Sequence, residues 1–281
     1  MLNATTKPAQ VDFFQMPDEL WCRCQQWIPR PLRRSPAGRK RADNRAVLNG
    51  IWYVLWTGCQ WKAIHKSWFG VCSSTLHARY QEWVQAGMFE QVMQALVQFY
   101  DQQRGVCWQW QAIDSKACPA PLGQAVTGKN PVDRAKQGSK IHLLVDERGA
   151  PLSVYVTAAN VNDKWLADEL IVALMLPRPD PRYVEQHLCA DKGYDYDDVR
   201  QFVAQRGYIA HIKRSRRYRD AQGTVSSEPK HPAHRLVIER TLSWLAKRRS
   251  LRTRWCKKAS NWLAFLHLAC AHILLDLAIY G

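Results

Sequence analysis

Three acidic residues stand in segments whose patterns would bring their side chains to one edge of a β-sheet. Asp114 lies in QAIDSKA, Asp191 in HLCADKGYD, and Glu239 in RLVIERTLSWLAKRRSLRTRWCKK. Asp114 and Asp191 each end an apolar, strand-like stretch, and sites in mixed sheets form at the carboxyl ends of strands. If the two strands are neighbours, about 4.8 Å apart, the carboxylates repel each other unless a cation lies between them. Mg²⁺ takes oxygen ligands and fits such a position.

Glu239 is the candidate for the third carboxylate of this metal site. It is the single acid among nine basic side chains in residues 235–258. On a helix, Ile238, Leu242 and Leu245 form the stripe that would pack on the sheet, and Glu239 lies at the edge of that stripe. Taken alone, Glu239 is more simply a helix acid paired with Arg235 four residues earlier. Its role as a ligand therefore depends on the other two acids being close.

The segments around these acids predict the elements that must hold them. Alternation in residues 106–114 and two strands around the ERG turn in 139–158 indicate an antiparallel meander, and short apolar strands are expected at 187–191 and 208–212. Helices are expected at 163–176, at 196–207, around Glu239 and at 262–281. This order predicts a mixed α and β fold, with a five-stranded mixed sheet flanked by helices and the fourth strand parallel beside the first.

Three regions are expected along the chain. Residues 1–42 contain a basic, proline-rich run and would form a flexible arm, residues 43–105 would form a small all-α domain, and residues 106–281 would form the sheet domain with the three acids. The all-α domain would contain a helix capped by Asp43 or Asn44 and ended by Gly58.

A second helix in this region is expected from a cap at Ser73 or Ser74 to Gly87. The spacing of the two helices resembles a helix-turn-helix, whose second helix would present Ser74, His77 and Arg79 near the major groove of DNA. A plain helical bundle is the alternative for the same pattern.

Composition favours a nucleic-acid partner inside a cell. Lys and Arg number 40 against 24 Asp and Glu, which gives a formal charge of +16, and the excess gathers in residues 30–45 and 206–258. The nine cysteines are scattered without a C-x-x-C pair, and the start of the chain lacks the apolar core of a signal peptide. We therefore expect reduced thiols and a cytoplasmic location. The apolar tail 262–281 is interrupted by two histidines and an aspartate, which favours a buried helix over a membrane span.

A resemblance to a known family follows from three segments in order. AIDSKA, ADKGYD and VIERTLSWL resemble the catalytic blocks of the DDE transposases of bacterial insertion sequences, most closely insertion sequence family five. RADNRAVLNGIWYVLWTGCQWKAI, GKNPVDRAKQGSKIHLLVDERGAPL and NWLAFLHLACAHILL resemble that family too, so the resemblance covers nearly the whole chain from about residue 40. It implies an RNase H-like fold on which Asp114, Asp191 and Glu239 are the catalytic, metal-binding residues.

The resemblance also implies an activity and partners. A transposase of this kind binds the terminal inverted repeats of an insertion sequence, cleaves the DNA and joins its 3′ ends to target DNA. It would use one or two Mg²⁺ ions, with Mn²⁺ as a substitute, to activate the attacking oxygen and to stabilise the leaving oxygen. Its partners would be double-stranded DNA and further copies of itself, as a homodimer or higher assembly. The resemblance also implies a location in the bacterial cytoplasm, at the nucleoid.

The chain departs from relatives around the glutamate. Their signature places a tyrosine seven residues and an arginine four residues before the glutamate, and a lysine seven residues after it. Arg235 matches the arginine, whereas Pro232 and Ala246 stand at the tyrosine and lysine positions and Lys247 is one place on. We therefore expect the metal site to be kept and the contacts with the DNA end to differ.

The candidate DNA contacts are basic or polar residues near these segments. They are Arg235, Lys247 and Arg248 on the helix around Glu239, Lys129, Arg134, Lys136 and Lys140 in the loop 116–140, Lys213 and Arg214 after the strand 208–212, and Ser74, His77 and Arg79 in the second helix. A solvated basic loop is the alternative for residues 116–140. Asp163, in the segment NVND, is expected to cap the following helix, with a supporting role near the acids as the weaker interpretation.

Three further possibilities remain to be weighed. GQAVTGKN, residues 123–130, is a near miss for a phosphate-binding loop, but Asn130 replaces the hydroxyl residue and prolines flank the segment, so no nucleotide cofactor is expected. An RNase H-like nuclease that cleaves without joining would share the metal site. A catalytically idle DNA-binding protein would use only the amino-terminal helices and the basic surface.

Overall fold

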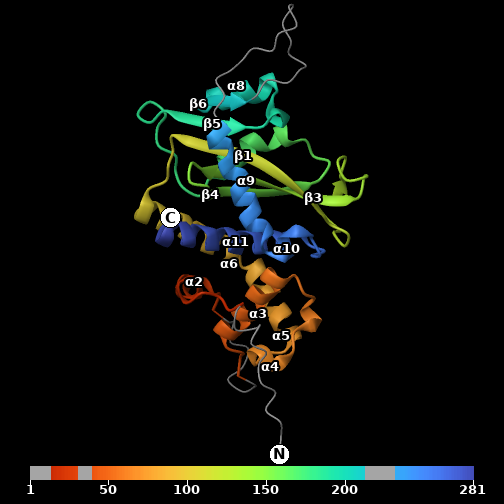
Figure 1. The fold of residues 1–281 in the computed structure, drawn as a ribbon. Helices are drawn as coiled ribbons and strands as arrows, with labels where there is room; N and C mark the ends of the chain where they lie inside the picture. Colours follow the sequence, from red (N-terminus) through yellow and green to blue (C-terminus); the bar gives the residue numbers. More distant parts are fainter. Residues whose placement is uncertain (1–13, 31–39, 213–231) are drawn as a thin grey trace, which may run out of the picture.

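The computed structural model describes residues 14–30, 40–212 and 232–281 (Figure 1). The strands are β1 (Trp110–Pro119), β2 (Gly128–Lys129), β3 (Gln137–Asp146), β4 (Pro151–Ala158), β5 (Gln186–Ala190) and β6 (Tyr208–Ile212). The α-helices are α2 (Asp18–Cys24), α3 (Asn44–Thr57), α4 (Lys66–Phe69), α5 (Ser73–Gln85), α6 (Met88–Arg104), α7 (Leu166–Val172), α8 (Asp197–Gln205), α9 (Pro232–Ala246), α10 (Arg249–Arg252) and α11 (Ala259–Tyr280). The 3₁₀ helices are η1 (Gln25–Trp27), η2 (Trp61–Ala63), η3 (Asp163–Trp165) and η4 (Lys192–Tyr194).

The strands form one mixed sheet in the order β4-β3-β1-β5-β6. The short strand β2 pairs with the first two residues of β3, Gln137 and Gly138. β3 is antiparallel to both β1 and β4, whereas β5 is parallel to β1 and β6 is parallel to β5. The prediction of an RNase H-like mixed sheet with the fourth strand parallel beside the first is therefore confirmed. The two-residue strand β2 is an addition to the five predicted strands.

β1 is longer than the sequence pattern indicated. It was expected to end at Asp114, but it continues to Pro119 because β3 pairs with it as far as Pro119 and Gly138. On its other side, β1 pairs with β5 only from Trp110 to Ala112. β1 therefore runs past the end of its parallel neighbour, and Asp114 lies in the stretch that β5 does not cover.

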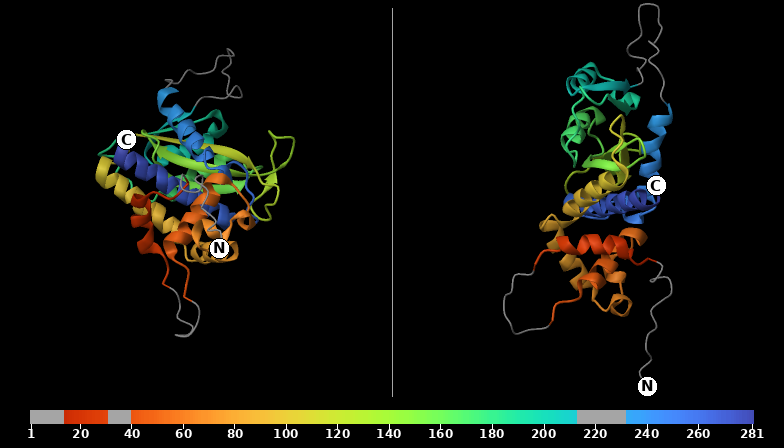
Figure 2. Two further views of the ribbon diagram at one scale, coloured as in Figure 1. Left: turned by 60° about the horizontal axis from the view of Figure 1, so that its bottom comes forward. Right: turned by 90° about the vertical axis from the view of Figure 1, so that its left-hand side faces the viewer.

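Helices cover both faces of this sheet (Figure 2). α9 packs on β1 and β3 through Ile238, Leu242 and Leu245, which are buried as predicted. The Thr241 hydroxyl donates to the carbonyl oxygen of Gly149 at 2.8 Å, and Gly149 has a positive φ of 86°. A Cβ on Gly149 would lie 2.7 Å from Thr241 Oγ1, so the turn between β3 and β4 needs glycine to accept α9 at this distance.

α7 and α8 lie on the side of the sheet away from α9 (Figure 2). α7 packs on β3 and β4, and the Ser153 hydroxyl of β4 donates to the carbonyl oxygen of Leu170 in α7 at 2.7 Å. Each of these helices is part of a connection into a strand parallel to its neighbour, as the parallel part of the sheet requires.

The predicted flexible arm contains a packed helix. Residues 1–42 were expected to be an arm, but Met16, Leu20 and Cys24 in and next to α2 are buried. Arg45 of α3 holds this segment by donating to the Met16 carbonyl oxygen and to Asp18. The arm prediction is therefore wrong for residues 14–24. It was based on the basic, proline-rich run that follows, and the short amphipathic helix before that run was not predicted.

The amino-terminal helices begin and end close to the predicted residues. The Asp43 carboxylate accepts from the backbone N–H of Ala46, and Gly58 ends α3 with a φ of 65°. α5 begins at Ser73, with Cys72 at its cap position, and follows α4 after a three-residue turn. α4 and α5 thus form a helix-turn-helix-like pair in which the first helix is a single turn.

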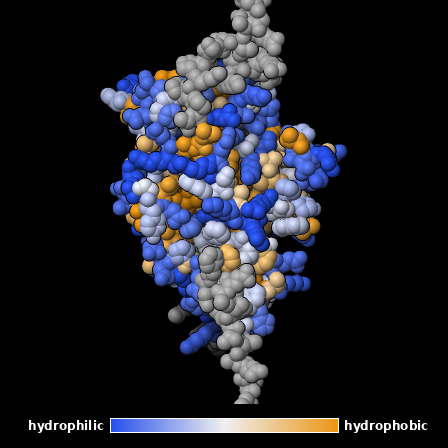
Figure 3. Space-filling view, in the orientation of Figure 1, coloured by the Kyte–Doolittle hydropathy of each residue, from blue (hydrophilic) through white to orange (hydrophobic). Residues whose placement is uncertain are grey.

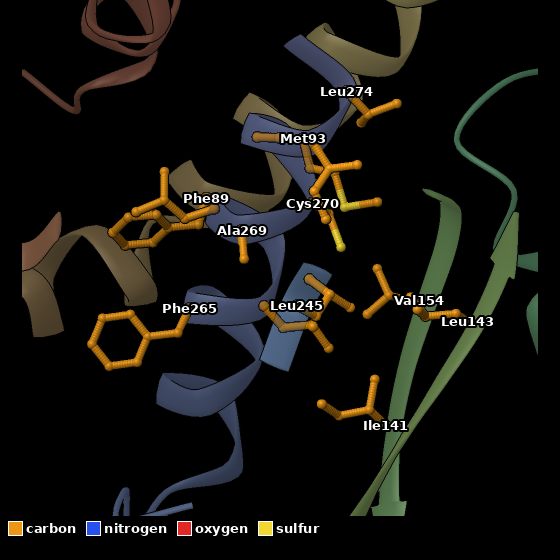
Figure 4. Packing of buried hydrophobic residues seen from close by; sticks show 14 of the residues in the cluster. Phe89, Met93, Ile141, Leu143, Val154, Leu245, Phe265, Ala269, Cys270 and Leu274 are labelled. Atoms are coloured by element: carbon orange, nitrogen blue, oxygen red, sulfur yellow. The ribbon is translucent and has the colours of Figure 1, made fainter. Parts of the chain in front are cut away.

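The amino-terminal helices and the sheet share one hydrophobic core. α11 lies between them, packing on α6, α5, β4 and α9 (Figure 4). The Tyr80 ring of α5 stacks on Phe265 of α11, and its hydroxyl donates to the Asn261 carbonyl oxygen. Ser250 donates to the Val54 carbonyl oxygen of α3 at 2.6 Å. Residues 43–105 are therefore not packed as a separate domain.

α11 is long and apolar enough to cross a membrane by length and composition alone, with a mean hydropathy of 1.9. However, 72% of its apolar window is buried inside the protein, including Trp262 and Leu274. α11 is therefore the central helix of the core, as the sequence predicted.

The shared core predicts a single unfolding transition. Phe265→Ala should lower the free energy of unfolding by about 3–5 kcal/mol, because it leaves a cavity between α5 and α11. Urea unfolding followed by circular dichroism and by tryptophan fluorescence should show one coincident, shifted transition. Tyr280→Ala, at a residue that is 79% exposed, should leave the midpoint unchanged. Two separate transitions, of which only one shifts, would contradict the shared core.

Candidate active site

Asp114, within β1, and Asp191, just after β5, lie at the same level of neighbouring parallel strands. Ala112 of β1 is level with Cys189 of β5, so two further residues along each chain bring Asp114 level with Asp191. Asp191 follows the last residue of β5 as predicted, and one of its carboxylate oxygens accepts from the Gly193 backbone N–H at 2.7 Å. Asp114 pairs across the sheet with Leu143, whose side chain is on the face that α9 and α11 cover (Figure 4).

The charges of the three predicted acids act on one another. The pKa of Asp114 is raised from 3.8 to about 6, first by burial and then by the negative charges of Asp191 and Glu239. The Ser115 N–H, which donates to Asp114 at 2.7 Å, and the Arg235 guanidinium oppose this rise. The structure therefore brings all three acids within electrostatic range, on β1, after β5 and on α9.

Glu239 lies at the exposed edge of α9. Its side chain is 49% exposed and forms an ion pair with Arg235 at 3.4 Å, one helical turn earlier. This is the helix ion pair that the residue type alone suggested. An exposed pair of this kind contributes little to stability, so Glu239 can leave Arg235 at small cost.

The donor set suits a hard divalent cation. Three carboxylates, one of them resisting ionisation by burial and by its acidic neighbours, match the oxygen ligands and the charge that Mg²⁺ or Mn²⁺ requires. Among the described residues, no three His, Cys, Asp or Glu side chains already stand close enough to hold an ion. Side-chain rotation at Asp114, Asp191 and Glu239 is therefore needed for the three carboxylates to meet at one ion.

Asp163 is partly buried and belongs to a polar network instead of capping a helix. Asn162 is the cap of η3, and its side chain accepts from the Lys164 N–H. Asp163 instead accepts from the Ser115 hydroxyl at 3.0 Å and from Lys140 Nζ at 2.8 Å. The capping prediction for Asp163 is therefore wrong, because the chain turns at Asn162 and directs Asp163 back under β1 and β3.

This network joins the strands directly beneath the site. Ser115 follows Asp114, so its side chain points to the opposite face of β1. His142 of β3 lies 3.8 Å from Asp163, and burial lowers its pKa to about 4, which keeps it neutral. Asp163 thereby fixes β1 against β3 at the residue next to Asp114. The sequence signal for this role was the alternation that places Ser115 and His142 on the same face.

A buried phenol stands beside the acids. Tyr194, in η4 after Asp191, is fully buried, and its hydroxyl has no hydrogen-bond partner among the described residues. Burial raises its pKa well above the usual value, and the charges of Asp163, Asp114 and Asp191 raise it further. Sequence analysis did not single out Tyr194.

Several predicted DNA contacts lie on the surface. Lys247, Lys129, Arg134, Lys136, Ser74 and His77 are exposed, and Arg235 is half-buried. Lys129, Arg134 and Lys136 belong to the loop between β1 and β3. Ser74 and His77 are on α5, on the far side of α11 from the sheet (Figure 1).

Two predicted contacts are buried and cannot reach DNA. Arg248 is 3% exposed, donates to the Trp244 carbonyl oxygen and to His272, and lies over the Trp56 ring, so it ties α9 to α11 and α3. Arg79 is 5% exposed and donates to Asn44. Both predictions are wrong, because these guanidinium groups are enclosed by helices that are distant in the sequence and meet only in the folded chain.

The remaining predicted contacts differ in their placement. Lys140 is mostly buried in its ion pair with Asp163, so its charge is already balanced. Lys213 and Arg214 lie outside the described residues. In the segment 123–130, β2 is a two-residue strand and no helix follows it, which differs from the strand, loop and helix of a phosphate-binding loop.

Comparison with known proteins identifies the family. Residues 110–274, more than half of the chain and the part with all three acids, match the family "Transposase DDE domain". The chain belongs to the DDE transposase family. Residues 16–93 match the family "Putative transposase of IS4/5 family", so the resemblance found in the sequence is confirmed for both regions.

Two proteins of Burkholderia cepacia are similar to this DDE transposase. The "Putative transposase for insertion sequence element IS402" is 37% identical over 158 residues, which cover 54% of this chain and 69% of that protein. The "Insertion element IS402 uncharacterized 16.2 kDa protein" is 28% identical over 116 residues, or 41% of this chain and 79% of that protein.

Among solved structures, a piggyBac transposase synaptic complex with hairpin DNA is similar to this chain. The alignment covers 97% of this chain and 74% of the piggyBac transposase chain. The TM-score is 0.46 and the identity is 10%. At this TM-score the likeness shows neither fold nor partners, and the fold of this transposase follows instead from its own strand order.

The raised pKa of Asp114 predicts a pH-dependent gain in stability on substitution. Because folding raises this pKa from 3.8 to about 6, the charged carboxylate costs stability above pH 6, and the cost disappears below about pH 4. Asp114→Asn should therefore raise the free energy of unfolding of the metal-free protein at pH 8, by up to about 3 kcal/mol. The gain should shrink towards pH 4 in urea titrations with a chelator present.

Glu169→Gln, at an exposed residue of α7, is the matched control and should change stability little at any pH. An effect of Asp114→Asn that is equal at pH 8 and pH 4 would show that Asp114 does not have the raised pKa.

Proposed function

We propose that this transposase binds the terminal inverted repeats of an insertion sequence, cleaves the DNA there and joins the 3′ ends to target DNA. The observation that supports the proposal is that three acids from distant segments lie within electrostatic range of one another. Asp114, within β1, and Asp191, just after β5, are level in neighbouring parallel strands, and Glu239 on α9 is close enough to act on the pKa of Asp114.

The three carboxylates would hold one or two Mg²⁺ ions. Bound there, the metal would activate the attacking oxygen and stabilise the leaving 3′ oxygen of an in-line displacement. Asp114 and Asp191 would supply ligands from the sheet, and Glu239 would supply its ligand by turning away from Arg235. Arg235 would then be free to bind a phosphate of the DNA. The phosphate would replace the Glu239 carboxylate as the anionic partner of Arg235.

The surface around α9 supports a DNA substrate. The face with α9 and α10 is largely hydrophilic (Figure 3), and the chain has a formal charge of +16. Exposed Lys247, directly after α9, and Lys129, Arg134 and Lys136, between β1 and β3, would contact phosphates on either side of the acids. Ser74 and His77 on α5 would contact a more distant part of the same DNA.

Two further parts of the proposal concern the setting of the reaction. The protein would act in the bacterial cytoplasm, where its nine thiols stay reduced. It would act as a homodimer or higher assembly, because two transposon ends have to be cleaved and joined together.

The acids predict a selective loss of chemistry. Asp114→Asn, Asp191→Asn and Glu239→Gln should each reduce Mg²⁺-dependent cleavage and joining by about a thousandfold or more, because the bound metal supplies several kcal/mol of transition-state stabilisation. The substrate is an oligonucleotide duplex with the end of the source element, and products are resolved on sequencing gels. DNA binding should remain, since the substitutions remove negative charge.

Glu169→Gln and Asp168→Asn, at exposed residues of α7, serve as matched controls and should keep full activity. Full activity in any one of the three active-site variants would remove that residue from the metal site. A duplex cut beforehand to leave a free 3′ hydroxyl separates joining from cleavage. Cleavage without joining of this duplex would identify a nuclease instead of a transposase.

A further inference from the structure

A second surface of interest lies where α10 joins α11, beyond the end of β1. Trp255 is 55% exposed there, and its neighbours Arg252, Lys257 and Lys258 are exposed as well. We call these four residues the Trp255 surface. None of them was among the predicted DNA contacts, and none takes part in the site formed by the three acids.

The connection that presents Trp255 is held rigidly by a buried arginine. Arg254 is fully buried, and its guanidinium donates to the carbonyl oxygens of Val126, Cys256 and Lys257 and to the Ser139 hydroxyl, at 2.7 to 3.1 Å. Its backbone N–H donates to the Pro119 carbonyl oxygen at 2.8 Å. The backbone on both sides of Trp255 is thereby fixed to β1 and to the loop after it.

The charge around Trp255 has one sign. The chain contains no Asp or Glu between Glu239 and Asp276. In the adjoining loop, Asp133 already pairs with Lys136 at 3.3 Å. Among the described residues, no acid forms an ion pair with Arg252, Lys257 or Lys258, and Arg252 Nε donates to the Ala246 carbonyl oxygen. These exposed cations favour a polyanion as the partner of this surface.

The Trp255 ring differs from the other well-exposed tryptophan. Trp165 is 63% exposed, but the Lys164 ammonium lies 4.3 Å from its ring centroid. In the described part of the chain, Trp255 has no aromatic or cationic partner of this kind. An indole held in solvent by a rigid backbone and flanked by lysines has the features of a base-stacking platform.

The position of this surface along β1 sets its distance from the acids. Pro119, to which Arg254 is bonded, is five residues after Asp114 in the same strand. At about 3.3 Å per residue this is about 17 Å, which corresponds to about five nucleotides at 3.4 Å each. DNA that has its scissile phosphodiester at the acids and runs along β1 would therefore reach Trp255 about five nucleotides away.

We propose that Trp255 stacks on a DNA base about five nucleotides from the scissile phosphodiester, while Arg252, Lys257 and Lys258 contact the phosphates beside that base. The inference rests on the proposed function, because it takes the acids as the point of cleavage. It adds a contact that holds the DNA end and requires the base at that position to leave the regular stack.

Binding and photocrosslinking test this contact without cleavage. The probe is a duplex with the end of the source element, with 5-iodouracil placed at one position at a time along the first ten nucleotides from the cleavage site. With a chelator present, the wild type should crosslink most strongly about five nucleotides from that site. Trp255→Ala should abolish this crosslink and weaken binding about 5- to 100-fold, whereas Trp255→Phe should retain both.

Two further variants separate stacking from charge. Trp165→Ala, a matched exposed tryptophan, should keep the crosslink and the affinity. The double variant Lys257→Gln and Lys258→Gln should lower the slope of log Kd against log salt by about two, because two phosphate contacts are lost.

Three results would overturn the proposal: unchanged affinity and crosslinking in Trp255→Ala, a crosslink maximum far from five nucleotides, or a loss of binding in Trp255→Phe as large as in Trp255→Ala. Because no cleavage is needed, these results are independent of the substitutions at the three acids. If the acid variants kept full activity, the proposed chemistry would be disproved. The position of the crosslink to Trp255 could still be measured in that case.

Discussion

The short parallel pairing between β1 and β5 is the constraint on which the candidate active site depends. It covers only the residues from Trp110 to Ala112, and β5 then ends while β1 continues with β3 alone. Asp114 and Asp191 therefore emerge together at a notch in the sheet. If β5 continued alongside β1, its backbone and side chains would fill the space in which the carboxylates face α9. The chemistry depends on where one strand stops as much as on the acids themselves.

Two cations balance the acids around this notch. Arg235 pairs with Glu239 on the exposed side, and Lys140 pairs with Asp163 on the buried side. The Arg235–Glu239 pair is half-exposed and therefore weak. The Lys140–Asp163 pair is mostly buried, and Asp163 also accepts a hydrogen bond from the Ser115 hydroxyl. The arrangement keeps the strands fixed beneath Asp114 while it leaves Glu239 able to move. Stiffness on one face and freedom on the other are what the proposed metal site would need.

Local patterns predicted the strands, their order and the positions of Asp114 and Asp191, because alternation and strand-end position depend on nearby residues. Glu239 was selected through the other two acids and the resemblance, since its own segment predicted only a helix ion pair. Local patterns did not predict the fate of individual basic residues. Arg248 and Arg79 were predicted to be surface charges. Arg248 is instead enclosed by Trp244, Trp56 and His272, and Arg79 donates a hydrogen bond to Asn44. Such burial depends on helices that meet only in the folded chain. The length of β1 was missed for the same reason, since its pairing with β3 continues beyond the apolar stretch.

The placement of α11 between the amino-terminal helices and the sheet has a consequence for how these proteins diversify. A recognition module that folds alone can be exchanged between proteins by recombination. Here α5 is packed on α11 through Tyr80 and Phe265, and α11 in turn packs on β4. A chimera that takes only the helices from another element would bring a mismatched surface to α11. Binding preference and catalysis are therefore expected to be inherited together, and new specificities to arise by substitution on the outer face of α5.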